Sequence, residues 1–263
     1  SASPVPQDGR VTVVAYALGE KSFLDENGNN VYDAGELFQD LGNVFLDRKY
    51  DAFFNAAEDQ SVPLVPTGGA TLACDPSSSP LLATDVTIPS QPNTCSRQWG
   101  TAHVRRALQT IFSTSGARPV WGTSRPSSAG ATGGNCPASV QLIDSYTNDV
   151  ANRTTYYPVG GGLYGLPASG AISFFLSDAN PVAFNPMAAG TTLSVNTTDG
   201  LAAAVLGGSP VPSVSRPTAA TISYKFDTAS TGTVTLNIAS PSGLVTSIPL
   251  FLSTGASPGA CLN

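Results

Sequence analysis

Six short segments in the second half of the chain constrain the fold most, because apolar and polar residues alternate in each of them. Turn-forming runs separate the segments, such as Asp-Ala-Asn-Pro at 178–181 and Ser-Pro-Ser-Gly at 240–243. A period of two puts alternate side chains on opposite faces of a β-strand, so one face can be buried. The segments are 139–144, 170–177, 191–197, 219–227, 232–239 and 244–252. Their lengths and spacing predict a two-sheet β-sandwich over residues 136–263.

The first half predicts two longer alternating strands, at 9–23 and 101–115. Only 11% of the residues are charged, whereas a typical soluble domain has about 25%. The hydrophobic fraction of 41% still provides enough apolar residues for a core. We therefore expect an all-β protein in two parts. A first domain would occupy residues 1–123, a glycine- and serine-rich linker 124–135, and the sandwich 136–263.

The four cysteines do not form a Cys-x-x-Cys pair, which argues against a zinc site or a thioredoxin-like redox centre. An even number of cysteines in a chain rich in serine, threonine and glycine indicates an oxidising compartment. Proximity along the chain favours a Cys74–Cys95 pair and a Cys136–Cys261 pair. Four buried thiols remain the alternative, because free cysteine is among the most buried residue types.

Acidic residues gather in one region of the chain. Residues 1–60 contain eleven of the eighteen acidic residues and only four of the twelve basic residues. Nucleic-acid binding needs a basic surface, so this distribution argues against it and favours binding of a cation. No stretch approaches the roughly 20 consecutive apolar residues of a membrane-spanning helix, so we expect no membrane span in this chain.

The sequence Phe-Leu-Asp-Glu-Asn-Gly-Asn-Asn-Val-Tyr-Asp-Ala-Gly-Glu-Leu-Phe, at 23–38, carries oxygen-bearing side chains at alternate positions. Calcium takes six to eight oxygen ligands, and a twelve-residue loop supplies them from positions 1, 3, 5, 7, 9 and 12. The residues at these positions are Asp25, Asn27, Asn29, Val31 through its carbonyl, Asp33 and Glu36. Position 6, which needs a positive φ, holds Asn30, a residue that tolerates this conformation.

Two other interpretations of this segment stay open. Asp-Asn-Gly clusters are common in ordinary polar turns. Paired carboxylates can also act as acid and base, but no candidate nucleophile lies nearby in the sequence. Asp40, four residues after Glu36, could complete this site or that of the second loop described below, or face solvent.

A second, weaker copy of the loop begins 22 residues later. The equivalent ligands are Asp47, Asp51, Phe53 through its carbonyl, Asn55 and Glu58. Lys49 replaces the ligand at position 3, and Ala52 stands where a positive φ is required. We expect Lys49 either to turn outward and leave a weak site, or to place its ammonium where the ion would lie.

Together, the segments 9–47 and 99–117 resemble bacterial Ig-like domains of the invasin/intimin-related group, some of which carry an inserted pair of calcium loops similar to an EF-hand or dockerin pair. The segment at 172–205, with its Asn-Pro and Ala-Gly-Thr-Thr motifs, is similar to the same group. This resemblance implies an Ig-like fold in which residues 1–123 supply only the closing strands of a first domain. It also implies that the insertion covers about residues 24–60, and that the protein is bacterial and lies at the cell surface or is secreted.

The expected function is that of a calcium-stabilised structural or adhesion module without enzymatic activity, next to other Ig-like domains or copies of itself. One alternative is a subunit of an extracellular filament or surface layer that assembles by strand addition. A carbohydrate-binding module is a second alternative, for which exposed aromatic residues would provide the platform. The candidates are Tyr156, Tyr157 and Tyr164.

Overall fold

The computed structural model of the protein describes residues 7–62, 72–74, 89–130, 136–144, 153–257 and 259. Throughout these residues the regular secondary structure consists of strands and includes no helix, which confirms the all-β fold. The chain forms two compact units. The sandwich unit comprises Ser1–Gly9 with Ile111–Asn263, and the ribbon unit comprises Arg10–Thr110.

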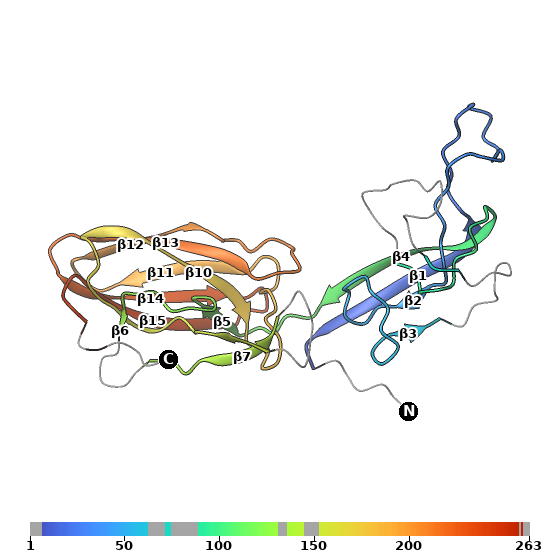
Figure 1. Ribbon diagram of the computed structural model, residues 1–263. Helices are drawn as coiled ribbons and strands as arrows, with labels where there is room; N and C mark the ends of the chain where they lie inside the picture. Colours follow the sequence, from blue (N-terminus) through green and yellow to red (C-terminus); the bar gives the residue numbers. More distant parts are fainter. Residues whose placement is uncertain are drawn as a thin grey trace. The chain divides into compact units, whose positions relative to one another are not determined.

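Two sheets make up the sandwich unit, with the strand orders β12-β13-β10-β5 and β11-β14-β15-β9-β6 (Figure 1). The first sheet contains β5 (Ala117–Val120), β10 (Ser169–Asp178), β12 (Leu201–Gly207) and β13 (Thr218–Phe226). The second contains β6 (Ala129–Gly130), β9 (Gly161–Leu163), β11 (Thr192–Thr197), β14 (Thr231–Ala239) and β15 (Val245–Ser253). Neighbouring strands are antiparallel, except that β9 runs parallel to β15. A separate antiparallel hairpin consists of β7 (Val140–Ile143) and β8 (Arg153–Tyr156).

The core lies between these two sheets and is built from alternate side chains of the strands. Along β14, Val234, Leu236 and Ile238 are fully buried, while the residues between them are partly exposed. Ile222 of β13 and Leu250 of β15 belong to the same buried cluster. Burial of one such side chain contributes about 1.5–3 kcal/mol to folding, so this alternation is the main source of stability in the sandwich unit.

All six segments predicted in the second half form strands whose ends differ by at most one residue from the prediction. The strand β12 was not predicted, because its outward positions hold Ala202, Ala204 and Leu206 in place of polar residues. Leu206 is 63% exposed, so the periodicity of this strand is hidden by apolar residues that face solvent.

The predicted domain boundary at 124–135 is wrong. The two units are divided between residues 9 and 10 and between residues 110 and 111. β5 pairs with β10 and β6 pairs with β9, so residues 117–130 form edges of the sandwich and not a linker. Residues 131–135 lie outside the described residues. The glycine and serine content indicated flexibility, but Gly130 is buried against Tyr164, where a larger residue would clash.

The ribbon unit is built on β1 (Arg10–Glu20) and β4 (Thr101–Ile111), which confirm the two long predicted strands. The N–H of Phe112 donates to the carbonyl of Gly9 (2.8 Å), and the N–H of Lys21 donates to the carbonyl of Gly100 (3.0 Å). These two bonds make the pair antiparallel. A short hairpin of β2 (Phe45–Leu46) and β3 (Gln60–Ser61) lies in the same unit. In the described part of the ribbon unit, no third strand pairs with β1 or β4.

The predicted Cys74–Cys95 disulfide is confirmed. Leu72 and Cys95 exchange two backbone hydrogen bonds beside it, so the bridge closes a small antiparallel pair. Cys136 is disulfide-bonded as well. Its predicted partner, Cys261, lies outside the described residues.

Candidate metal centre

The first acidic loop is organised around the carboxylate of Asp25. Its Oδ1 accepts hydrogen bonds from the N–H groups of Gly28 (2.7 Å) and Asn29 (3.2 Å), and its Oδ2 accepts one from Asn30 (2.7 Å). These bonds, above all the one from Asn30, lower the pKa of Asp25. Asn30 has a φ of 60°, the conformation that position 6 of the calcium-loop pattern requires. The chain therefore turns sharply around position 1.

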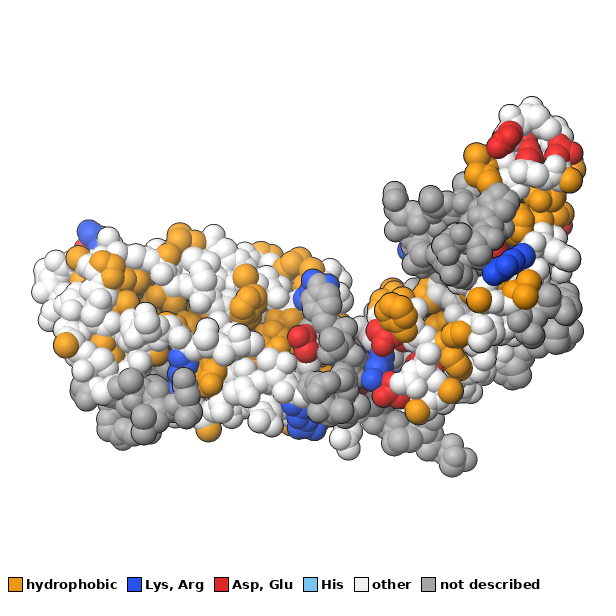
Figure 2. All heavy atoms as spheres, in the orientation of Figure 1, with side chains coloured by type: hydrophobic (Ala, Val, Ile, Leu, Met, Phe, Trp, Pro, Cys, Tyr) orange, Lys and Arg blue, Asp and Glu red, His pale blue; other side chains and the backbone are white. Residues whose placement is uncertain are grey.

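Glu36 closes this loop from its far end. Its Oε1 accepts a hydrogen bond from the N–H of Glu26 (3.0 Å), and its Oε2 accepts one from the N–H of Asp33 (2.8 Å). Glu36 is 6% exposed, whereas most of the loop lies in solvent. Figure 2 shows carboxylates gathered at the end of the projecting loop, which is blue in Figure 1. Positions 2, 9 and 12 are thus held together by one buried side chain.

The central acid of the loop, Asp33, already receives two donors. Its Oδ2 accepts hydrogen bonds from the side-chain amides of Asn27 (2.6 Å) and Asn29 (2.8 Å). The carbonyl oxygens of the same amides accept the N–H groups of Asn29 (3.0 Å) and Val31 (2.7 Å). The two amide groups thus stand where a cation would meet Asp33, and they would have to turn their N–H groups away to admit one.

The donor set of the first loop fits calcium by its chemistry. The predicted ligands are three carboxylates, two amides and the carbonyl of Val31, all of them oxygen donors. Among the described residues, no group of three or more histidine, cysteine, aspartate or glutamate side chains is close enough together to hold a metal ion. The three acids Asp25, Asp33 and Glu36 instead bind the loop's own N–H groups.

A cluster of aromatic rings supports the base of this loop. Tyr32 stacks on Trp99, with ring centroids 4.7 Å apart and an interplanar angle of 7°. Phe23 contacts both rings edge-on, and Phe38 contacts Tyr32 in the same way. The indole N–H of Trp99 donates to the carbonyl of Lys21 (2.9 Å). The sequence pattern gave no indication that Trp99 belongs to this site. Because Trp99 contacts the base of the loop, its fluorescence can report on the loop.

The second loop repeats the backbone turn of the first. The carboxylate of Asp47 accepts hydrogen bonds from the N–H groups of Tyr50 (2.5 Å) and Ala52 (2.7 Å). Tyr50 has a φ of 58° and Ala52 a φ of 70°, at the places of Gly28 and Asn30. Both residues disfavour this region, so the second turn costs conformational energy that the first avoids. Burial raises the pKa of Asp47, in contrast to its counterpart Asp25.

The residue that closes the second loop is Asp59. The offset of 22 residues between the two loops predicted Glu58, the equivalent of Glu36. Asp59 accepts hydrogen bonds from the N–H groups of Arg48 (3.0 Å) and Asn55 (2.7 Å), which correspond to the two groups that Glu36 binds. The second loop is therefore one residue longer at its end. Glu58 also accepts a hydrogen bond from the side-chain amide of Asn55 (3.0 Å).

Lys49 lies against the second loop and does not turn away from it. Its Nζ is 2.6 Å from Oε2 of Glu58, and the two side chains are 17% and 34% exposed. The other predicted residues of this loop take local roles, since Asp51 accepts the N–H of Phe53 (2.9 Å). Of the two alternatives for Lys49, this contact favours the second, in which the ammonium lies where the ion would be.

Asp40 belongs to neither loop. Its carboxylate pairs with the ammonium of Lys21, and both side chains are 4% exposed. It also accepts the N–H of Arg97 (2.7 Å). The ammonium of Lys21 donates in addition to Ser96 (2.7 Å) and to the carbonyl of Gln98 (2.8 Å). Asp40 therefore ties the segment after the first loop to residues 96–98, and the structure places its carboxylate on Lys21 and Arg97.

The aromatic platform suggested for carbohydrate is not formed. Tyr156 and Tyr164 are each only 6% exposed. Tyr156 stacks on Phe184, with ring centroids 4.2 Å apart, and Tyr157 is covered by the guanidinium of Arg125, 4.9 Å from its ring centroid. Tyr156 and Tyr164 pack within the sandwich unit, so the expected exposure of these two rings is wrong, whereas Tyr157 is half-buried.

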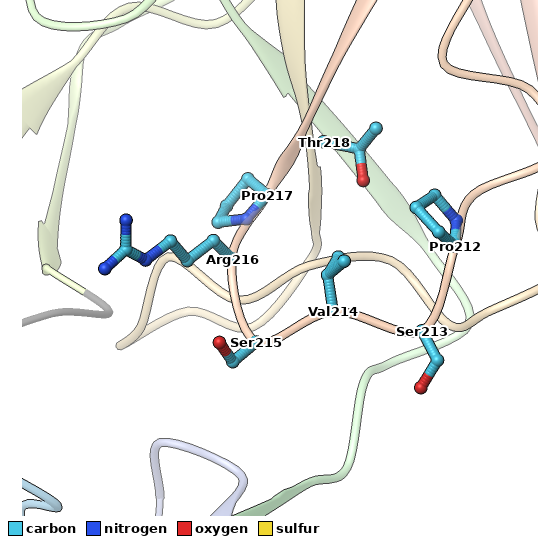
Figure 3. A pocket seen from close by; sticks show the side chains of 7 residues that line it. All are labelled: Pro212, Ser213, Val214, Ser215, Arg216, Pro217 and Thr218. Atoms are coloured by element: carbon cyan, nitrogen blue, oxygen red, sulfur yellow. The ribbon is translucent and has the colours of Figure 1, made fainter. Parts of the chain in front are cut away.

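A surface pocket of about 540 Å³ lies in the sandwich unit and is lined by residues 212–218 (Figure 3). The lining comes from one continuous segment that ends at the first residue of β13, and Figure 3 shows the side chain of Arg216 extending away from the hollow. The lining contains no acid, histidine or cysteine. Because polar groups from separate elements do not converge there, we assign the pocket no role.

The chain matches no known protein family, no curated protein and no solved structure. None of its described residues belongs to a helix that is long and apolar enough to cross a membrane.

Proposed function

We propose that the protein is a calcium-stabilised structural module, and that the first acidic loop is its ion site. The observation that carries this proposal is the role of Glu36, which binds the N–H groups of positions 2 and 9 and closes the loop on itself. In calcium loops of this pattern, the acid at position 12 binds the ion from the far end of the loop with both of its carboxylate oxygens. The ligands would be Asp25, Asn27, Asn29, the carbonyl of Val31, Asp33 and Glu36.

The ion would act on stability and not on a reaction. Three carboxylates of one short loop repel one another, and a divalent cation would turn this repulsion into attraction. The loop has little apolar core of its own beyond the contacts of Tyr32. Binding energy gained only in the folded state would therefore stabilise the ribbon unit.

The sandwich unit is proposed to be Ig-like. Its strand orders support this, because β5-β10-β13-β12 and β11-β14-β15 correspond to the A-B-E-D and C-F-G sheets of a seven-stranded Ig sandwich. The parallel pair of β9 and β15 adds a further strand beside the last one. The Cys74–Cys95 disulfide supports a location outside the cytoplasm, on a bacterial surface or in secreted form. A structural or adhesion role agrees with these features.

Removal of calcium is expected to lower the melting temperature of the ribbon unit and to open residues 24–60 to proteases. At a calcium concentration one hundred times the dissociation constant, the ion would contribute about 2.7 kcal/mol. Fluorescence of Trp99 during thermal unfolding, with calcium and with chelator, measures the effect. The Asp33→Asn variant should lower the affinity about tenfold or more, since it removes one charged ligand. Asp199→Ala, which changes an exposed acid of the sandwich unit, is the control. An equal melting temperature in calcium and in chelator would refute the proposal.

Substitution of Lys49 by asparagine is expected to create a second ion site. The change removes the ammonium that lies 2.6 Å from Glu58 and supplies an amide oxygen at position 3. Calcium titration by calorimetry should then show one more bound ion than in the native protein. Lys225→Asn, which alters an exposed lysine of the sandwich unit, should leave the number of ions as it is. An unchanged stoichiometry for Lys49→Asn would show that Lys49 does not block the second loop.

A further inference from the structure

One face of the β1–β4 ribbon is apolar and exposed. Gly9 lies opposite Phe112, and Lys21 lies opposite Gly100. The spacing is equal on both strands, so the register is constant and Val13 lies opposite Leu108. Val13 is 53% exposed and Leu108 is 63% exposed. Further along the same face, Ala15, Ala17 and Val104 are exposed as well, and the exposed Arg106, opposite Ala15, is the charged residue of this face.

Within the residues that the structure describes, the outer edge of β1 is also unpaired. Along each strand of an antiparallel pair, the backbone N–H and C=O groups of one residue bond the neighbouring strand, and those of the next residue point away from it. Because Gly9 and Lys21 bond β4, the even-numbered residues between them point their N–H and C=O groups outward. These residues are Arg10, Thr12, Val14, Tyr16, Leu18 and Glu20. In the described part of the chain, no backbone group outside β1 and β4 bonds the residues from Thr12 to Leu18.

The outer edge of β4 differs, because other segments of the ribbon unit cover it. The carbonyl of Ala107 accepts a hydrogen bond from the hydroxyl of Tyr50 (3.4 Å), and the carbonyl of His103 accepts one from Arg105 of the same strand (3.2 Å). Arg105 also donates to the carbonyl of Gly42 (2.8 Å) and to the hydroxyl of Ser90 (2.6 Å). β1 is therefore the edge at which the ribbon can be extended.

This edge lacks the features that prevent strands from pairing between molecules. Proteins protect sheet edges with lysine, proline, bulges or very short strands. In the sandwich unit, the edge strand β6 has only two residues, and β12 has a break in register between Val205 and Gly207. β1 has eleven residues without lysine, proline or a bulge. A bare two-stranded ribbon is marginally stable, whereas three or more strands with an apolar face are stable.

We infer that β1 pairs with β1 of a second copy of this chain, antiparallel and over its full length. In this register Thr12 bonds Leu18 of the second copy, and Val14 bonds Tyr16 of the second copy. The two charged residues of β1 are Arg10 and Glu20, which have opposite signs and come to lie opposite each other, with the buried guanidinium of Arg10 also bonded to Gln109 (2.7 Å). The result is a four-stranded sheet in the order β4-β1-β1-β4. Val13 and Leu108 of both copies lie on the same side of this sheet, and Arg106 of each copy lies on that side as well.

The first test is the molecular mass of the full chain in solution, measured by light scattering across a wide range of concentrations. The native protein should form a dimer, and Val14→Pro should weaken dimerisation about tenfold or more. Proline removes an N–H that faces outward, so it leaves the bonds between β1 and β4 intact. Val14→Ala keeps that N–H and is the matched control. A native protein that stays monomeric, or a Val14→Pro variant that dimerises as the native protein does, would overturn the inference.

The second test locates the contact by cross-linking. Ala15 lies opposite Ala15 of the second copy, at a pair without hydrogen bonds where Cα atoms are about 4.5 Å apart, within the range that a disulfide spans. Ala15→Cys should therefore form a covalent dimer on mild oxidation. Ala17→Cys is the control, because Ala17 lies opposite Val13 of the second copy. Equal cross-linking of the two variants would contradict this register. Dimerisation in chelator as in calcium would separate this inference from the proposed ion site.

Discussion

Lys21→Met is expected to lower the free energy of unfolding of the ribbon unit by about 3–5 kcal/mol. The ammonium of Lys21 has three partners: the carboxylate of Asp40, the hydroxyl of Ser96 and the carbonyl of Gln98. Lys21 and Asp40 are each 4% exposed, so methionine would leave a buried carboxylate without its counter-charge. Removing one partner of a buried ion pair costs far more than the net value of the pair, because the remaining charge is not solvated.

Urea unfolding followed by the fluorescence of Trp99 measures this loss, since Trp99 bonds the carbonyl of Lys21. Lys225→Met is the matched control. Lys225 also pairs with an aspartate, Asp227, at 2.7 Å, but the two side chains are 68% and 46% exposed. Water screens such a pair, so the control should unfold at the same urea concentration as the native protein. A loss for Lys21→Met no larger than for Lys225→Met would show that burial does not govern the Lys21–Asp40 pair.

The strands could be predicted because their signal is local. Residues such as Val234, Leu236 and Ile238 alternate with polar neighbours, and this alternation directly reports which face is buried. The first loop was predictable for the same reason, since the position of Asn30 required a positive φ and the residue has one. Where outward positions are apolar, as at Leu206, the local signal fails and the strand was missed.

The unpredicted features depend on contacts between distant residues or on a shift of register. Lys21 and Asp40 are far apart in the chain and meet only because the segment after the first loop folds back. The alignment by a constant offset assigned the closing role to Glu58, but the β2–β3 hairpin pairs Leu46 with Gln60 and brings Asp59 into that position. The glycine and serine content of residues 124–135 predicted a flexible linker. Gly130 is instead a glycine because its backbone packs closely against Tyr164.

Asp178→Ala is expected to destabilise the sandwich unit by about 2–4 kcal/mol. Asp178 ends β10 and is fully buried. Its carboxylate accepts the N–H groups of Thr114 (2.7 Å) and Asn180 (3.1 Å), which alanine would leave unpaired. Asp178→Asn keeps one acceptor oxygen and should cost less, about 1–2 kcal/mol. Fluorescence of Trp121, which packs against the core of this unit, reports its unfolding. Asp199→Ala, at an exposed position, should have no effect.

The same carboxylate should make the sandwich unit less stable as the pH rises. Burial raises the pKa of Asp178, although the N–H groups of Thr114 and Asn180 and the charge of Arg118 oppose the shift. The folded state therefore binds the proton more tightly than the unfolded state, whose aspartate pKa is about 3.9. The resulting stabilisation is complete below that pH and is lost as the pH passes the folded pKa. Asp178→Asn cannot titrate, so its free energy of unfolding should lack this decline. If the free energy of unfolding changed with pH equally in the native protein and in Asp178→Asn, the titrating group would be another residue.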